Sequence, residues 1–218
     1  PLADAANPTP VKFANASGVP ANFVAPGDYS FWELLDKVIQ EEPSEGSDPT
    51  TLGLFASIGI QKGKPFAPDE RMKKILADAA NIGAVTARTL AFKIREKDAF
   101  FYPDSHWRLP FFGGYKFEVS PGVANLDGAA FFYYFATGVT PAMEEKMVGK
   151  GSQYPWTALD SHGHPFEGAK TYKLHLPPHI PVKDFRSVIV YDTQTRSMLQ
   201  TDQPAPSVSS QNKAMKVN

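Results

Sequence analysis

The sequence contains no cysteine, which excludes several kinds of chemistry at once. Disulfide bridges, thiolate metal sites and cysteine nucleophiles all need that residue. Long hydrophobic runs are missing as well, since no apolar stretch approaches the ~20 residues of a membrane helix. We therefore predict no membrane span in this chain. The missing cysteine leaves the compartment open, because an exported protein can do without disulfides.

An excess of charge of one sign is also missing. The 22 Lys and Arg residues nearly balance the 23 Asp and Glu residues, so no basic field predicts nucleic-acid binding. The sequence has no G-x-x-x-x-G-K phosphate loop, no G-x-G-x-x-G turn, no H-E-x-x-H pair and no EF-hand loop. We accordingly predict no cofactor. Aromatic residues are plentiful, with 16 Phe, 8 Tyr and 3 Trp among 218 residues, and they predict an aromatic core.

The first hundred residues have the pattern of helices. After Asp28, a plausible N-cap, apolar side chains recur at helical spacing: Phe31, Leu34, Leu35, Val38 and Ile39. Asp48-Pro49 opens a shorter segment in the favoured order of cap and first-turn proline. Asp69 and Glu70 begin the longest helix, whose apolar face runs for about six turns to Leu90 and includes small residues that predict a close neighbour. Residues 1–100 are thus predicted to form a mainly helical subdomain with an extended N-terminal segment.

The pattern changes near residue 100, after which short strands are predicted. Residues 115–119 and 185–192 read as strands, and residues 156–160 and 171–176 read as a hairpin with a glycine-containing loop. In the predicted strand 171–176, Tyr172, Leu174 and Leu176 face one side and Lys173 and His175 the other. The apolar run 129–137 fits a buried strand or a helix. Residues 202–218 show no closing element.

Three long stretches of the sequence resemble a known family. They are KGKPFAPDERMKKIL, ATGVTPAMEEKMVGKGSQYPWTALDSHGHPFEG and KTYKLHLPPHIPVKDFRSVIVYDTQTRSMLQTDQ. They are similar to the bacterial domain of unknown function 1214 family (DUF1214), whose members usually carry a companion domain, DUF1254, immediately upstream. The resemblance implies an α+β fold in which a helical subdomain precedes a jelly-roll-like antiparallel β-sandwich at residues 101–218. It implies no established reaction, substrate or cofactor.

This sequence differs from the family in two ways, and both differences affect which partners we expect. The upstream companion domain and the last strands of the family are both missing from this sequence. We therefore expect a sandwich that is incomplete at its C-terminus, as in a fragment, a cleaved chain or one piece of an assembly that pairs with a second chain. The family resemblance and the first residue, Pro1, predict a periplasmic or secreted protein, with a cytoplasmic form as the alternative.

A first candidate site is the DSHGH segment. Asp160, His162 and His164 could form one face of a zinc or copper site, because alternate residues of an extended chain point the same way. The alternative is an ordinary polar turn. The resemblance implies Asp, Asn and Gly here rather than paired histidines, so we predict no metal and keep these residues only as candidates.

Two further clusters could bind a ligand. Tyr191, Asp192, Gln194 and Arg196 follow a strong strand, and Arg196 could clamp a carboxylate. The alternative is a β-turn in which Asp192 bonds its own backbone. Trp107 could stack on a sugar whose hydroxyls Arg108 binds. The alternative there is a linker whose tryptophan anchors the helices to the sheet.

Three functions fit these observations. The first is an exported binding protein for a sugar or a small carboxylate. The second is a hydrolase or lyase that uses Tyr, His, Asp and Arg in the same cleft. The third is a structural or assembly module whose open sheet edges mate with another chain.

Overall fold

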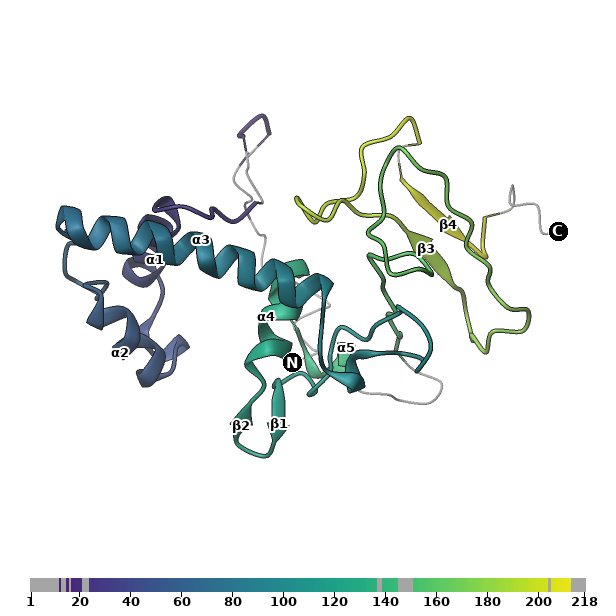
Figure 1. Ribbon diagram of the computed structural model, residues 1–218, viewed down its shortest axis with the longest axis horizontal. Helices are drawn as coiled ribbons and strands as arrows, with labels where there is room; N and C mark the ends of the chain where they lie inside the picture. The colour runs from purple at the N-terminus through teal and green to yellow at the C-terminus, as the bar shows by residue number, and fades with distance from the viewer. Residues whose placement is uncertain are drawn as a thin grey trace.

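The computed structural model describes residues 12, 15, 17–20, 24–136, 139–144, 151–203 and 205–212. Within them the chain contains helices and two antiparallel sheets of two strands each, so the protein is α+β as predicted (Figure 1). These small sheets form no sandwich or jelly roll in the described residues. The predicted N-terminal extended segment lies largely outside them, and the domain boundary at residue 100 stays a prediction.

The three predicted helices of the N-terminal region are confirmed. They are α1 (Ser30–Glu41), α2 (Pro49–Ser57) and α3 (Glu70–Phe92), followed by a 3₁₀ turn at Lys97–Ala99. Asp48 and Asp69 cap α2 and α3 by accepting hydrogen bonds from the N–H groups of Thr51 (2.9 Å) and Met72 (2.7 Å). Asp28 is not the N-cap of α1, which is Tyr29. Its carboxylate accepts from the N–H of Ser30 instead.

Polar contacts link α1 to α3 and to the loop that follows α2. The indole N–H of Trp32 donates to the carbonyl of Leu76 in α3 at 2.7 Å. The Lys62 ammonium donates to the carbonyls of Gln40 (2.7 Å) and Glu42 (2.9 Å), which satisfies groups that the end of the helix leaves unpaired. The predicted close neighbour of α3 is the backbone of Gly27, where a Cβ atom would lie 3.2 Å from that of Ala84.

The apolar run that fitted a strand or a helix is a helix, α4 (Leu126–Phe135), and a short α5 (Pro141–Glu144) follows. The side chain of Asn125 caps α4 by accepting from the N–H of Gly128 at 2.8 Å. α4 packs against α3 and supplies the fully buried Phe131 to an aromatic core, as predicted from composition. The other members of this core are Ile94, Ala99, Phe112, Phe100 and Trp156.

The strand predictions hold only in part. The strands are β1 (Glu118–Ser120) paired with β2 (Val123–Ala124), and β3 (Ser187–Ile189) paired with β4 (Ser207–Ser209). The predicted strand 115–119 starts late because Gly113, Gly114 and Phe117 all have positive φ, which turns the chain away from an extended path. Strand 185–192 shrinks to β3. The prediction of no closing element after residue 202 was wrong, because β4 lies there.

The predicted hairpin between residues 156–160 and 171–176 was also wrong. Trp156 forms an isolated bridge with Arg108, and Leu159 forms one with Pro165, which lies six residues before the start of the second predicted strand. Residues 171–176 have no assigned strand, turn or bend. No helix in the described residues is long and apolar enough to cross a membrane.

Candidate functional site

The segment from Tyr191 to Arg196 forms a tight turn whose hub is a single carboxylate. Oδ1 of Asp192 accepts hydrogen bonds from the N–H groups of Gln194 (2.8 Å) and Thr195 (2.7 Å). These bonds, led by the one from Thr195, hold the pKa of Asp192 below its usual value. Arg196 closes the turn with φ of 62°, and Tyr191 bridges to Met198. The backbone geometry is that of the β-turn alternative.

Two side chains of this turn attach it to the helices. Nη1 of Arg88 in α3 donates to Oε1 of Gln194 at 2.5 Å. Nη1 of Arg196 donates to the carbonyl of Tyr134 at 3.1 Å, in the last turn of α4, where helix carbonyls lack an internal partner. The turn thus docks on the C-terminal halves of two helices that are far away in the sequence.

Arg196 also reaches the apolar face of α1. A hollow of about 340 Å³ lies there, lined by Arg196 and by the apolar residues Val24, Ala25, Pro26, Phe31, Leu34, Leu35 and Val38. Among these described lining residues Arg196 is the charged one. The sequence indicated Arg196 as a candidate ligand residue and the apolar side chains of α1 as one face of a helix, but nothing in the spacing of residues predicted that the two would lie together. The sequence analysis therefore missed that this face of α1 lines a hollow. Its unbroken helical period was a signal of a contact face.

The structure gives Arg108 a supporting position. Its side chain is 2 % exposed and donates from Nη1 to the carbonyl of Ala91 (2.7 Å) and from Nη2 to that of Phe92 (2.8 Å), which caps α3. The guanidinium lies 5.7 Å from the ring centre of Trp156, and Nε has no described hydrogen-bond partner. Burial lowers the pKa of Arg108. Its contacts are those of an anchor between α3 and the aromatic core.

Trp107 is half-buried, and its carbonyl accepts from the N–H of Phe101 at 2.8 Å. No described hydrogen bond or ion pair joins Trp107 or Arg108 to the turn at 191–196. The two predicted ligand clusters are therefore not brought together by direct polar contacts in the described part of the chain. Their ligand-binding role stays a prediction.

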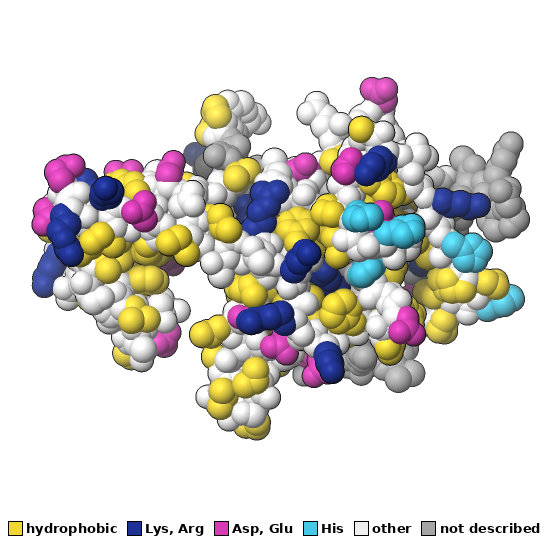
Figure 2. Space-filling view, in the orientation of Figure 1, with side chains coloured by type: hydrophobic (Ala, Val, Ile, Leu, Met, Phe, Trp, Pro, Cys, Tyr) yellow, Lys and Arg dark blue, Asp and Glu magenta, His cyan; other side chains and the backbone are white. Residues whose placement is uncertain are grey.

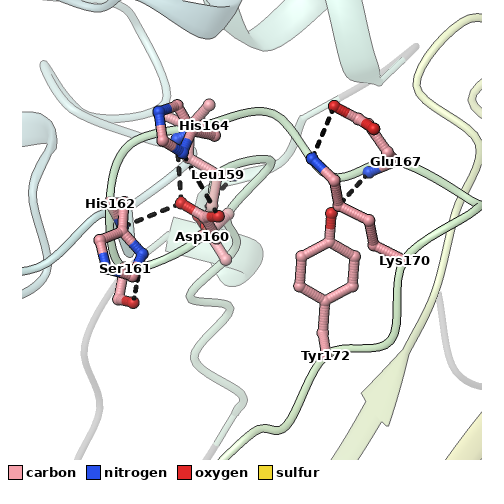
Figure 3. Close-up of polar contacts among 9 residues, drawn as sticks. Leu159, Asp160, Ser161, His162, His164, Glu167, Lys170 and Tyr172 are labelled. Carbon is pink, nitrogen blue, oxygen red and sulfur yellow. Dashed lines mark hydrogen bonds and ion pairs between the residues drawn. The ribbon is translucent and has the colours of Figure 1, made fainter.

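The DSHGH segment is a turn organised by Asp160 (Figure 3). Oδ1 of Asp160 accepts from the N–H groups of His162 and His164, both at 2.9 Å. The bond from His164 contributes most to lowering the pKa of Asp160. Gly163 takes a φ of 78°, and His106 lies beside it. These contacts engage one carboxylate oxygen in the turn itself.

The two imidazoles of this turn stack rather than converge. Their ring centres are 6.2 Å apart with planes inclined by 19°, and Nδ1 of His164 is 3.8 Å from Oδ2 of Asp160. No group of three potential metal ligands gathers in the residues that the structure describes. Figure 3 also shows the neighbouring contacts of Glu167 with Lys170 (2.9 Å) and with the Tyr172 hydroxyl (2.8 Å).

The family comparison agrees with the resemblance noted from the sequence. The model of a family described as "Protein of unknown function (DUF1214)" matches residues 151–218. This range contains the 191–196 turn, the DSHGH turn and both strands of the β3–β4 sheet. No curated protein matches the chain. The comparison does not show the companion DUF1254. The family match confirms the DUF1214 resemblance over residues 151–218, and the function of that family is unknown.

Proposed function

We propose that this chain is a binding module whose exposed faces are completed by another polypeptide. The observation that carries the proposal is the exposure of large apolar side chains on the helices. In α1 and α3 these include Phe31, Leu34, Val38, Ile82 and Val85. A partner that packs on these helices would remove the side chains from water.

The apolar face of α1 is the best-defined of these surfaces. The side chains of Phe31, Leu34 and Val38 are 37 %, 52 % and 50 % exposed. The apolar face that an amphipathic helix normally packs against the protein therefore faces solvent in α1. Ile82 and Val85 of α3 are exposed by 66 % and 58 %. Figure 2 shows hydrophobic side chains at the surface of the region formed by α1 to α3. Contiguous apolar patches on soluble proteins commonly mark interaction sites.

The occupant we propose for this face is the companion domain that the family resemblance implies. Family members usually carry DUF1254 next to DUF1214, so the two would meet in one protein or as separate chains. Export to the periplasm or the medium belongs to the same proposal, and its support is the resemblance alone.

The test mixes the 218-residue protein with a separately produced DUF1254 domain and measures the mass by light scattering after gel filtration. We expect a one-to-one complex. Val38→Glu should weaken it at least about tenfold, because the change buries an unpaired charge. Val123→Glu is the matched control, since Val123 has nearly the same exposure (51 %) but lies at the β1–β2 hairpin, and it should leave the affinity unchanged. Failure of the wild-type chains to associate would overturn the proposal.

A second candidate function rests on the hollow beside α1. Its apolar lining and Arg196 suit a small carboxylate with an apolar body better than a sugar, which needs several polar partners. Titration with decanoate should show binding that Arg196→Gln abolishes and Arg186→Gln, away from the hollow, preserves. Equal affinities in these variants would contradict this function. The hydrolase or lyase alternative is not carried forward. It needs Tyr, His or Asp side chains beside an arginine, and among the described residues that line the hollow Arg196 is the single one with a titratable side chain.

A further inference from the structure

Residues 171–176 have the sequence of a strand without the partner of one. Their side chains alternate between apolar and polar, and all six residues are exposed, with Tyr172, Leu174 and Leu176 at 40 to 44 %. Figure 1 shows the chain passing through this segment without helix or arrow before it reaches β3. A period-two pattern that buries neither face indicates that part of its environment is missing.

The backbone of this segment is unpaired as well. In the part of the chain that the structure describes, no N–H or C=O group of residues 171–176 makes a hydrogen bond. The nearest bonds flank it, from Lys170 to Glu167 and from Val182 to Ile180. A row of open donors and acceptors on an alternating segment is the template to which a further strand adds.

The local charge indicates what kind of strand would fit. Residues 170–186 contain Lys170, Lys173, Lys183 and Arg186 but only one acidic residue, Asp184, in a chain whose net charge is −1. Lys170 is already paired with Glu167 at 2.9 Å. Lys173 has no ion pair among the described residues, and it shares one face of the segment with His175. Acidic side chains on a partner strand would lie opposite this face.

A second copy of the chain fits less well. Antiparallel self-pairing about Leu174 would match the apolar faces, but it would set Lys173 opposite His175 and bring no opposite charge to either. A partner that alternates apolar with acidic residues satisfies the backbone, the apolar face and the charges together.

We propose that residues 171–176 accept an added β-strand from a polypeptide in which apolar and acidic residues alternate. This inference deepens the proposed function by giving the chemistry of a second contact, at a place separate from the α1 face. The added strand pairs its backbone with the open N–H and C=O groups, covers Leu174 and its apolar neighbours, and places carboxylates at Lys173.

The experiment measures fluorescence anisotropy of two labelled, capped peptides, TVEVEVT and TVKVKVT, titrated with the 218-residue protein. We expect the glutamate peptide to bind at least about tenfold more tightly than the lysine peptide. Lys173→Glu should abolish or reverse this preference. Lys183→Glu makes the same charge change outside the strand and should preserve the preference. A glutamate peptide methylated on alternate backbone nitrogens should lose binding, because it cannot complete the ladder.

Three results would overturn the inference: no binding of the glutamate peptide, equal binding of its methylated form, or equal effects of the two lysine substitutions. Self-association of the wild-type protein that Lys173→Glu strengthens would assign the edge to a second copy and also overturn it. Peptide binding that Val38→Glu leaves unchanged would support the strand site even if the α1 face binds no companion domain, so the two proposals fail separately.

Discussion

Arg108 shows how much of the structure depends on a single side chain. It satisfies two carbonyls at the end of α3 and contacts the rings of Phe100 and Trp156 while almost wholly buried. A buried guanidinium with several partners is costly to truncate, because the partners are left unpaired.

We predict that Arg108→Met lowers the free energy of unfolding by about 3 kcal/mol, since the carbonyls of Ala91 and Phe92 lose their donors. Arg108→Lys should lose about half as much, because one ammonium keeps the charge but cannot reproduce the planar fork. Urea unfolding followed by circular dichroism measures both. Losses below about 0.5 kcal/mol in both variants would show that Arg108 is no anchor.

Asp192 gives a prediction about pH. Its pKa is depressed in the folded protein, so the carboxylate supports the turn at neutral pH and this support is lost as the pH falls through the folded pKa, below the ordinary 3.8. The amide signals of Gln194 and Thr195 should therefore titrate in that acidic range in NMR spectra. Asp192→Asn should keep the turn and remove the titration, because an amide oxygen still accepts. Persistence of the titration in this variant would assign it to another group.

The candidate residues show what sequence reasoning could and could not supply at this scale. Asp192 was predicted either to bind a ligand or to organise a turn, and the turn alternative could be stated because its hydrogen bonds are local. Arg108 and Arg196 look alike in sequence. One caps α3 and the other bonds to a carbonyl of α4, and those contacts span 16 to 62 residues. No local spacing encodes contacts of that length.

At the scale of elements, two helical glycines test how closely the Asn125 cap packs on the first turn of α4. A Cβ atom at Gly83 of α3 would meet nothing within 4 Å, whereas one at Gly128 of α4 would lie 3.0 Å from Cγ of Asn125, the α4 cap. Both positions are otherwise helical. The pair separates helix propensity from damage to the cap.

We predict that Gly83→Ala raises the free energy of unfolding by about 0.5 to 1 kcal/mol, because alanine loses less backbone entropy on folding. Gly128→Ala should lower it by about 1 kcal/mol or more, because the cap of α4 is displaced. Thermal melts of the two variants measure the difference. A gain of the same size at both sites would contradict the tight cap at Asn125.

The N-terminal helices were predictable here and the strands only in part, for a physical reason. The period of α1 and α3 and the caps at Asp48 and Asp69 involve residues within a few positions of one another. β3 instead pairs with β4 about twenty residues away, in a stretch whose polar composition suggested no structure. Residues 171–176 have a good strand pattern and no strand, because pairing requires a second chain segment that the pattern does not contain.

At the scale of the whole molecule, two groups of contacts share one long helix. Trp32 bonds to α3 near its start, whereas Trp156 packs on Phe131 and Phe135 with ring centres 5.2 and 4.3 Å apart. Between them, every residue from 81 to 86 is exposed. Elements that share few buried contacts unfold with separate free energies.

We therefore predict different unfolding midpoints for the two groups. A variant that keeps Trp32 alone, with Trp107→Phe and Trp156→Phe, should lose its native fluorescence at lower urea than one that keeps Trp156 alone, with Trp32→Phe and Trp107→Phe. The aromatic core buries more apolar surface, so its tryptophan reports the later transition. Coincident midpoints would show a single cooperative unit.

The exposed middle of α3 also sets the angle, about the helix axis, between the contacts at its two ends. From Leu76 to Ala91 the helix rises about 22 Å, and every residue between them turns the far end by about 100°. One residue inserted between 81 and 86 would therefore rotate the aromatic core by more than a quarter turn about the helix axis while leaving its own contacts intact. Seven inserted residues, close to two full turns, would nearly restore the direction. A partner that contacts both ends of the helix would therefore bind these two insertion variants differently because of the angle between the ends, and not because of the added length.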